Sequence, residues 1–403
     1  MIKLFILRKI ILPLIFRIYS RKQIDEKMIV FADYRSKELP DNMRFLYERL
    51  NSLGYNTVLF LKPKESKNKV TNQWYIFLYF CNFNKYFATA KHVVLTDYFP
   101  PLYANSRRPQ TKVIQLWHAC GAFKKWGYST LAAGWGISEK AVKKYPIHTN
   151  YTHVTVSSKE VIPYYAQAFN MSKKKIFAYG IARTDVFFNS AYKKGAKETI
   201  YNVIEKKSQT DKLFDAQGKD FRDKKIILYA PTYRGDNIYS SYNSNVLNVK
   251  MLSSFLNEEY LLICKLHPLV ASGFKIEDSN KNFVFDVSGD VNISEALCAA
   301  DVLISDYSSL IFEYSLLERP MIFYAYDMDQ YIDSRGFYYD YKEMVPGPIV
   351  KDTIQLLSKL ENIDEWFDIE KVKRFKEKFM NACDGNSTSR IIDEIFLKED
   401  NKC

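Results

Sequence analysis

From Met28 onward, short runs of branched and aromatic residues alternate with longer stretches of helical periodicity, a pattern typical of parallel α/β sheets. The predicted strands in the first half of the chain are 28–33, 55–61, 93–97, 113–117, 154–157 and 176–179. Those in the second half are 225–230, 260–266, 283–286, 301–305 and 320–324. Asp41 is expected to cap a helix that runs to Leu53 and is closed by Gly54. The alternation predicts two doubly wound α/β lobes with a ligand between them, at the carboxyl ends of the strands.

A polar, lysine-rich stretch over 191–224 separates the two alternating regions and contains no strand pattern. We therefore predict a first lobe over 28–190, an interlobe connection over 191–224 and a second lobe over 225–375. A helical carboxyl-terminal segment over 376–403 follows, and residues 1–27 precede the first strand. The chain of 403 residues is long enough for two domains of about 150 residues each with extra segments.

The amino-terminal segment 1–27 begins with 22 residues that are basic and apolar, with six lysines and arginines and no acidic residue. Its longest apolar run, 10–16, is interrupted by Pro13 and is shorter than the roughly 20 residues that cross a bilayer. A small-residue cleavage site, as in a secretory signal, is absent. We predict that the segment lies in the membrane interface with its cations on anionic headgroups. An ordinary packed first helix or a partner-binding helix is the alternative.

The formal net charge of +12 favours an anionic partner, such as nucleic acid, anionic lipid or a phosphorylated small molecule. Long tracts of lysine and arginine are absent and the aromatics lie in apolar runs, which argues against nucleic acid. Six widely spaced cysteines without a Cys-x-x-Cys pair indicate neither zinc nor a disulfide framework, so a reducing cytoplasm is the simplest interpretation. The absence of a Walker A sequence and of a glycine-rich dinucleotide fingerprint argues against a nucleotide hydrolase or nicotinamide enzyme.

His118 directly follows the predicted strand 113–117, and Gly121, Lys124 and Lys125 come shortly after it. An imidazole at a strand end titrates near neutral pH, and the glycine turn with two lysines is suited to a phosphorylated ligand. General base is therefore the best role for His118. A hydrogen-bonded loop histidine with solvated lysines is the structural alternative.

Two strand ends of the second lobe also carry phosphate-binding chemistry. Thr232 and Arg234 follow the strand 225–230, and a guanidinium fork with a hydroxyl donor suits phosphate oxygens. His267 follows the strand 260–266 and is placed to protonate or hydrogen-bond a leaving phosphate. A surface salt bridge for the arginine and a satisfied core histidine are the alternatives. The remaining histidines lack such neighbours and are interpreted as structural: His92, His148 and His153.

Segment 301–315 has the strongest local pattern, a buried strand, a polar turn and an amphipathic helix that opens near Ser308. Free backbone N–H groups and the hydroxyls of Ser308 and Ser309 would form an anion site that fits a pyrophosphate. Helix capping also explains the serines, but less easily Asp306 and Glu313 around the same turn. These two carboxylates are expected to support the site or, for Glu313, to meet a ribose hydroxyl.

Asp327 and Asp329 match the Asp-x-Asp pattern that holds a divalent ion in many nucleotide-sugar transferases. Two carboxylates after a strand are common in loops, and Arg234 with a helix start would neutralise a diphosphate without a metal. We therefore expect neither a metal ion nor a cofactor.

Several motifs, taken in order over 28–396, resemble those of the CDP-glycerol glycerophosphotransferase family. They are Leu116–Lys125, Ala230–Arg234, Lys265–Pro268, Asp301–Ser309 and Asp340–Pro348, with Asp41-Asn42, Asp384-Gly385 and Ser389-Arg390 also in place. The resemblance implies two Rossmann-like lobes in a glycosyltransferase-B-like fold, the first on the acceptor side and the second binding the nucleotide donor without metal. It implies catalytic roles for His118 and His267. Donor-phosphate contacts are implied for Arg234, Ser308 and Ser309.

The segment after His118 departs from that resemblance. Many members carry His-Gly-Thr-Pro-Leu-Lys where this chain has His-Ala-Cys-Gly-Ala-Phe-Lys, and such changes occur in members that handle ribitol or other polyol phosphates. We expect transfer of glycerol phosphate from CDP-glycerol, or of another polyol phosphate such as ribitol phosphate from CDP-ribitol, with release of CMP. The expected acceptor is a polyprenyl-diphosphate-linked saccharide at the cytoplasmic face of a bacterial membrane, in teichoic-acid synthesis. A nucleotide-sugar glycosyltransferase and a non-catalytic membrane scaffold are the alternatives of other classes.

Overall fold

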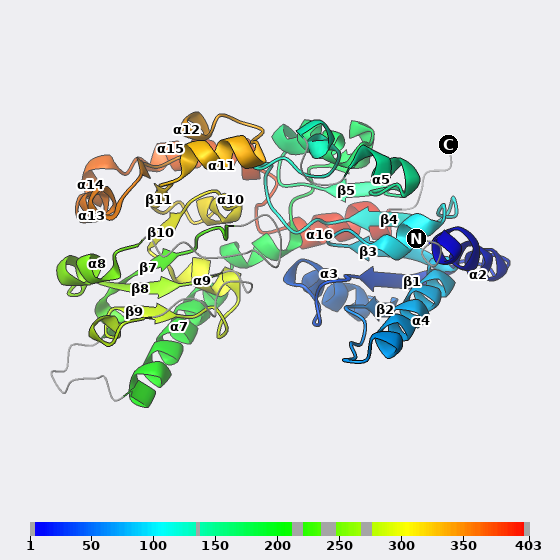
Figure 1. Ribbon diagram of the computed structural model, residues 1–403, viewed down its shortest axis with the longest axis horizontal. Helices are drawn as coiled ribbons and strands as arrows, with labels where there is room; N and C mark the ends of the chain where they lie inside the picture. The colour runs from blue at the N-terminus through cyan, green and yellow to red at the C-terminus, as the bar shows by residue number, and fades with distance from the viewer. Residues whose placement is uncertain (1–4, 134–137, 212–220, 235–246, 267–275, 399–403) are drawn as a thin grey trace. The chain divides into compact units, whose positions relative to one another are not determined.

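A computed structural model describes residues 5–133, 138–211, 221–234, 247–266 and 276–398. The chain divides into two α/β units (Figure 1). The first unit comprises 1–121, 125–185 and 381–403, and the second comprises 122–124 and 186–380. The prediction of two α/β lobes with parallel sheets is thus confirmed, while the boundaries differ from those predicted.

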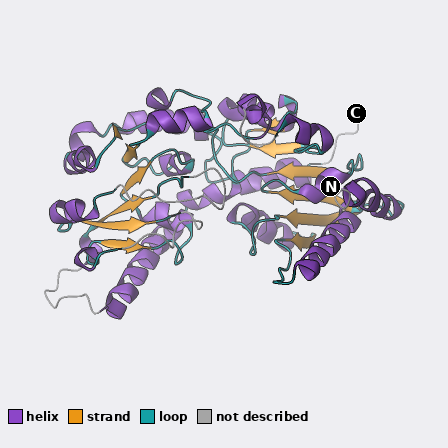
Figure 2. Cartoon of the chain, in the orientation of Figure 1, coloured by secondary structure: helices purple, strands orange, loops and turns teal. Residues whose placement is uncertain are grey.

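The first unit is built on a parallel sheet of six strands in the order β2-β1-β3-β4-β5-β6 (Figure 2). The strands are β1 (Asp25–Ala32), β2 (Asn56–Phe60), β3 (Ala90–Leu95), β4 (Lys112–Gln115), β5 (His153–Thr155) and β6 (Ile176–Phe177). The last four residues of β1 are fully buried, as expected for a parallel strand that helices cover on both faces. Each of the six predicted strands in this half of the chain is confirmed, with ends that shift by at most three residues.

The α-helices of the first unit are α2 (Leu12–Tyr19), α3 (Asp41–Ser52), α4 (Lys69–Phe87), α5 (Glu139–Lys144), α6 (Ile162–Phe169) and α16 (Ser387–Ile391), with π-helical turns at Leu7–Ile11 and Ile392–Leu397. Short 3₁₀ turns lie at Pro100–Ala104, Gly127–Ala133, Lys159–Val161 and Lys173–Lys175, and another, Ala182–Phe188, leads into the second unit. The prediction that Asp41 caps α3 is wrong, because Pro40 occupies the N-cap and Asp41 is the first helical residue. Gly54 closes that helix as predicted, with φ of 79°.

The carboxyl-terminal segment returns to the first unit, where Ile391, Ile395 and Phe396 join the core formed by strands β1, β3 and β4. Gly180, just after β6, has φ of 87°, and a Cβ there would lie 2.3 Å from Ser387 Oγ. Only a glycine therefore allows α16 to approach so closely. The predicted separate segment 376–403 is instead divided, and its residues from 381 onward belong to the first unit.

The second unit has its own parallel sheet, in the order β12-β11-β10-β7-β8-β9. Its strands are β7 (Lys225–Tyr229), β8 (Tyr260–Cys264), β9 (Val284–Asp286), β10 (Val302–Ser305), β11 (Met321–Tyr324) and β12 (Ile349–Val350). Sequence analysis missed β12, a two-residue strand whose position depends on the close approach of Gly347 to β11. A Cβ on Gly347 would lie 1.9 Å from the carbonyl oxygen of Met321.

The α-helices of the second unit are α7 (Ser190–Asp211), α8 (Val249–Leu256), α9 (Ile293–Ala299), α10 (Leu310–Ser315), α11 (Met328–Arg335), α12 (Tyr341–Met344), α13 (Thr353–Glu361), α14 (Ile363–Trp366) and α15 (Ile369–Met380), with 3₁₀ turns at Phe221–Asp223 and Asp278–Asn280. The stretch 191–224, predicted to connect the lobes, therefore begins as the helix α7. This helix belongs to the second unit and packs against α9. Its buried residues Ile200 and Ile204 explain why a polar sequence forms an ordered helix here.

Candidate active site

His118 follows a sharp bend at the carboxyl end of β4. Trp117, immediately before it, has φ of 57°, a left-handed conformation that is rare for a large side chain. The bend is held on both sides, because Trp117 N–H donates to Gln115 Oε1 (2.9 Å) and the buried Asn42 amide donates to the Trp117 carbonyl (2.6 Å). These hydrogen bonds therefore offset the backbone strain at Trp117 and fix the bend that precedes His118.

The imidazole of His118 lies beside the carboxylate of Asp97, with 3.8 Å between Nδ1 and Oδ2. Asp97 is fixed in turn by Arg35 Nε (3.0 Å) and by the Tyr98 N–H (2.6 Å), and Arg183 donates to the His118 carbonyl (3.1 Å). Although 52% of the His118 side chain is exposed, the protein packed around it lowers its pKa below 6.5. Asp97 raises that pKa and the two arginines lower it further. A neutral imidazole next to a carboxylate is the arrangement that a general base requires.

The rest of the His118 loop is hydrogen-bonded to the residues that follow β5 and to α6. The Gly121 N–H donates to Ser157 Oγ (3.2 Å), and the Tyr165 hydroxyl of α6 donates to the Ala119 carbonyl (2.9 Å). Gly121 has φ of 66°, so a glycine suits this turn. The loop is thus a fixed part of the first unit up to this residue.

Residues 122–124 pack with the second unit instead. Phe123 stacks on Phe337, with 4.9 Å between ring centroids, and Lys124 Nζ donates to the Tyr331 hydroxyl (3.0 Å). The amine also lies 5.4 Å from the centre of the Tyr331 ring. Lys124 and Lys125 are both partly exposed, and Lys124 has an aromatic partner in Tyr331.

Arg234 is buried between two carboxylates, not part of the surface salt bridge that was its structural alternative. Its Nε and Nη2 donate to the two oxygens of Asp327 (2.7 and 3.0 Å), and Nη1 lies 2.9 Å from Asp306 Oδ2. Burial alone would lower the pKa of Arg234, but the carboxylates outweigh it and raise that pKa above its usual value. Three tyrosine rings surround the guanidinium at 5.1 to 5.2 Å: Tyr307, Tyr326 and Tyr331.

Asp306 joins the ends of β7 and β10. Its Oδ1 accepts hydrogen bonds from the N–H groups of Thr232 (2.8 Å) and Tyr307 (2.6 Å), and its carbonyl accepts one from the Tyr341 hydroxyl (3.0 Å). The Thr232 hydroxyl is buried and has no hydrogen-bond partner among the described residues. A buried hydroxyl in this state indicates a place for a ligand oxygen.

The predicted serine turn opens α10, a helix of six residues. Ser309 is the N-cap but its side chain makes no capping hydrogen bond, and Ser308 Oγ accepts only a long one from Leu310 N–H (3.4 Å). Glu313, farther along α10, is 1% exposed. Simple capping therefore does not account for Ser309. His267, the second predicted catalytic histidine, lies outside the described residues.

The other histidines agree with a structural role. His148 is buried, its Nδ1 lies 3.1 Å from the Tyr151 hydroxyl, and burial lowers its pKa to about 3. His92 is also buried, and His153 stacks on Phe177. Sequence reasoning missed Asp97 as the neighbour of His118. The strand-end rule that located His118 applies equally to Asp97, because β3 and β4 are adjacent parallel strands.

Two parallel sheets with polar side chains at their carboxyl ends define a glycosyltransferase-B-like α/β fold. The sequence model of the CDP-glycerol:poly(glycerophosphate) glycerophosphotransferase family matches residues 14–397, and the protein belongs to this family. It is 36% identical over 373 residues to the teichoic acid ribitol-phosphate primase of Bacillus spizizenii. This alignment covers 92% of this chain and 91% of that protein. It is 31% identical over 304 residues to the teichoic acid glycerol-phosphate primase of Bacillus subtilis, with coverages of 75% and 73%.

Among solved structures, the wall teichoic acid polymerase TagF superposes with a TM-score of 0.71 at 25% identity, covering 94% of this chain and 92% of that one. A UDP-GlcNAc 2-epimerase from Neisseria meningitidis shares the fold alone, at 10% identity and a TM-score of 0.51. The protein is therefore a transferase of bacterial teichoic acid synthesis that takes a polyol phosphate from a nucleotide-activated donor.

Proposed function

We propose that the protein transfers ribitol phosphate from CDP-ribitol to a lipid-linked saccharide, with release of CMP. Similarity to the ribitol-phosphate enzymes carries this proposal. Four such relatives share 34 to 36% identity with the chain, whereas four glycerol-phosphate relatives share 28 to 31%. The departure after His118 from the His-Gly-Thr-Pro-Leu-Lys pattern supports the same choice, which reverses the order expected from sequence alone, where glycerol came first.

In the proposed reaction, His118 removes a proton from an acceptor hydroxyl. The resulting oxygen attacks the phosphorus that bears the polyol, a new P–O bond forms, and the P–O bond to CMP breaks with its electron pair leaving on CMP. Such transfers depend on positioning and on charge stabilisation. The lowered pKa of His118 supports this role, because the imidazole is then already neutral near neutral pH.

For the donor, we assign the diphosphate contacts to Thr232, Ser308 and Ser309. Among the described residues, the Thr232 hydroxyl has no hydrogen-bond partner, the Ser308 hydroxyl accepts one long hydrogen bond, and the Ser309 side chain does not cap α10. Arg234 supports the site by holding Asp306 and Asp327, since its N–H groups are largely occupied by these two carboxylates, which also balance its charge. Asp306 supports the site by fixing Thr232, and the burial of Glu313 favours the same supporting role over a ribose contact.

A donor panel tests this proposal. CDP-ribitol at a hundred times its Kd should raise the free energy of unfolding by about 2.7 kcal/mol, seen as a thermal shift, while CDP-glycerol at the same concentration should give a smaller shift. CMP release in the presence of a lipid-linked saccharide should follow the same order. A larger shift and faster CMP release with CDP-glycerol would overturn the ribitol assignment. A response to nucleotide sugars alone would indicate a glycosyltransferase.

We place the enzyme at the cytoplasmic face of the membrane, docked through an apolar stripe on two neighbouring helices of the first unit. The stripe has residues at every fourth position of the amino-terminal helices and of α4, and each is 41 to 78% exposed: Ile6, Ile10, Leu14, Ile18, Val70, Trp74 and Leu78. The helix α2 packs beside α4 (Figure 1). Four exposed basic residues of the amino-terminal segment would meet anionic headgroups: Lys9, Arg17, Arg21 and Lys22. Within the described residues, no helix is long and apolar enough to cross a membrane.

The double variant Leu14→Glu/Trp74→Glu should lose sedimentation with phosphatidylglycerol vesicles by at least about tenfold, because each exposed apolar side chain gains free energy on burial. The side chains of Leu14 and Trp74 are 56% and 55% exposed, so folding should be unaffected. The matched control is Phe255→Glu/Ile354→Glu, which changes two exposed apolar residues of the second unit. Equal sedimentation of the two variants would disprove docking through this stripe.

A further inference from the structure

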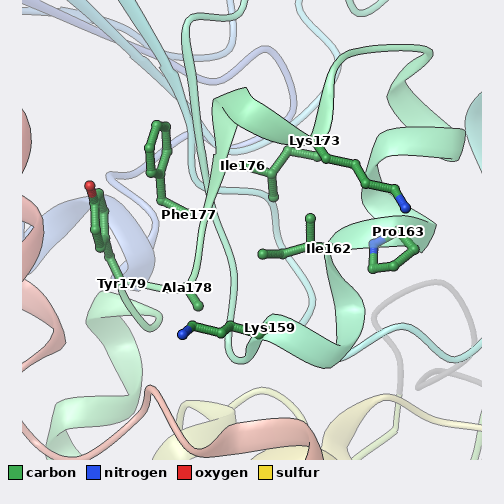
Figure 3. A pocket seen from close by; sticks show the side chains of 8 residues that line it. All are labelled: Lys159, Ile162, Pro163, Lys173, Ile176, Phe177, Ala178 and Tyr179. Atoms are coloured by element: carbon green, nitrogen blue, oxygen red, sulfur yellow. The ribbon is translucent and has the colours of Figure 1, made fainter.

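The first unit contains an open pocket of about 510 Å³ beside its edge strand β6 (Figure 3). Its apolar wall is formed by Ile162 and Pro163 at the start of α6 and by Ile176 and Phe177 of β6. Two exposed lysines, Lys159 and Lys173, also line the pocket, with Ile162 between them in this view, and Ala178 and Tyr179 complete the lining. The volume falls within the usual range of small-molecule sites, roughly 300 to 1,000 Å³.

The lining suits an amphiphile that has an apolar stretch and a negatively charged group. Neither Lys159 nor Lys173 forms an ion pair within the described part of the chain, and Lys174 and Lys175 extend the basic run beside the pocket. The one hydroxyl in the lining, that of Tyr179, lies 3.5 Å from a carboxylate oxygen of Glu394. A sugar or a nucleobase would therefore find few polar partners here, whereas an alkyl chain would find an apolar wall.

The same elements hold the His118 loop. Lys159 lies two residues after Ser157, whose hydroxyl accepts the Gly121 N–H of that loop. The helix α6 begins with the pocket residue Ile162, and one turn later its Tyr165 donates to the Ala119 carbonyl. A ligand in the pocket would thus contact the elements of the first unit that hold the His118 loop.

We propose that this pocket binds the prenyl diphosphate end of the lipid-linked acceptor, with the diphosphate on Lys159 and Lys173 and the first part of the prenyl chain against Ile162, Pro163 and Phe177. The proposal rests on the proposed function, because it assigns the acceptor of that reaction.

The test uses the full chain with the double variant Lys159→Gln/Lys173→Gln. Farnesyl diphosphate serves as a soluble probe of direct binding, and CMP release reports transfer to a prenyl-diphosphate-linked saccharide. Both the Kd for farnesyl diphosphate and the KM for the acceptor should rise about tenfold, as expected from losing charge-assisted contacts. The kcat at saturating acceptor and the thermal shift with the CDP-polyol should not change.

The matched control is Lys250→Gln/Lys351→Gln, which removes two exposed lysines of the second unit. Farnesyl diphosphate binding that is equal in the two variants would overturn the pocket assignment. The assignment would also be overturned if Lys159→Gln/Lys173→Gln no longer bound phosphatidylglycerol vesicles but still bound farnesyl diphosphate. The two lysines would then contact lipid headgroups. Absence of CMP release from every CDP-polyol by the unmodified chain would contradict the proposed function, while the farnesyl diphosphate measurement would still decide the pocket.

Discussion

His118→Ala should reduce kcat for CMP release by about 10² to 10⁴ fold, the usual contribution of a general base, while the thermal shift with the donor stays unchanged. The side chain is 52% exposed, so its removal should not unfold the first unit. His153→Ala is the matched control, because that imidazole also lies in the first unit and stacks on Phe177. A His118→Ala protein with the same kcat as the control would remove the assignment of His118 as the base.

The pH dependence provides an independent check of the same residue. Because the pKa of His118 is lowered below 6.5, the base is neutral at neutral pH, and kcat/KM should fall only as pH drops through that lowered pKa. Asp97 stabilises the protonated imidazole, so Asp97→Asn should lower the pKa further and move the acid limb to lower pH. It should also lower kcat, since the carboxylate orients the ring. An acid limb that moves to higher pH in Asp97→Asn would contradict this arrangement.

Arg234→Met should destabilise the second unit by about 3 to 5 kcal/mol, because it leaves the carboxylates of Asp306 and Asp327 without their buried cation. The Arg234 and Asp306 side chains are only 7% and 3% exposed, so solvent cannot replace the lost partner. Hydrogen exchange of β7 and β10 amides measures the effect locally, which avoids assuming that both units unfold together.

Arg222→Met is the control for that prediction, since its guanidinium is 40% exposed and its carboxylate partners lie 3.4 Å away on the surface. A change of about 0 to 1 kcal/mol is expected there. Donor affinity should also fall in Arg234→Met, because Asp306 would no longer be held against the Thr232 N–H. Amide protection and donor affinity equal to those of Arg222→Met would show that the buried pair supports neither folding nor the site.

Much of the fold could be predicted because the determining signals are local. Strands β1 to β11 follow from runs of branched and aromatic residues, and the helix start near Ser308 from a polar turn after a buried strand. The exception β12 is only two residues long, and its pairing depends on Gly347 approaching Met321. The stretch 191–224 is polar enough to resemble a linker, and only tertiary packing against α9 makes its residues 191–211 part of the helix α7 of the second unit.

For the candidate site, sequence alone determined that His118, Thr232, Arg234 and the serine turn at 308–309 follow strands, and so lie at the carboxyl edges of parallel sheets. The tertiary structure decided what each group contacts. Asp327, the main partner of Arg234, is 93 positions away in the chain, and α2 packs against the distant α4. The physical reason is that periodicity and turn chemistry act between near neighbours, whereas ion pairs and exposed faces depend on which distant segments packing brings together.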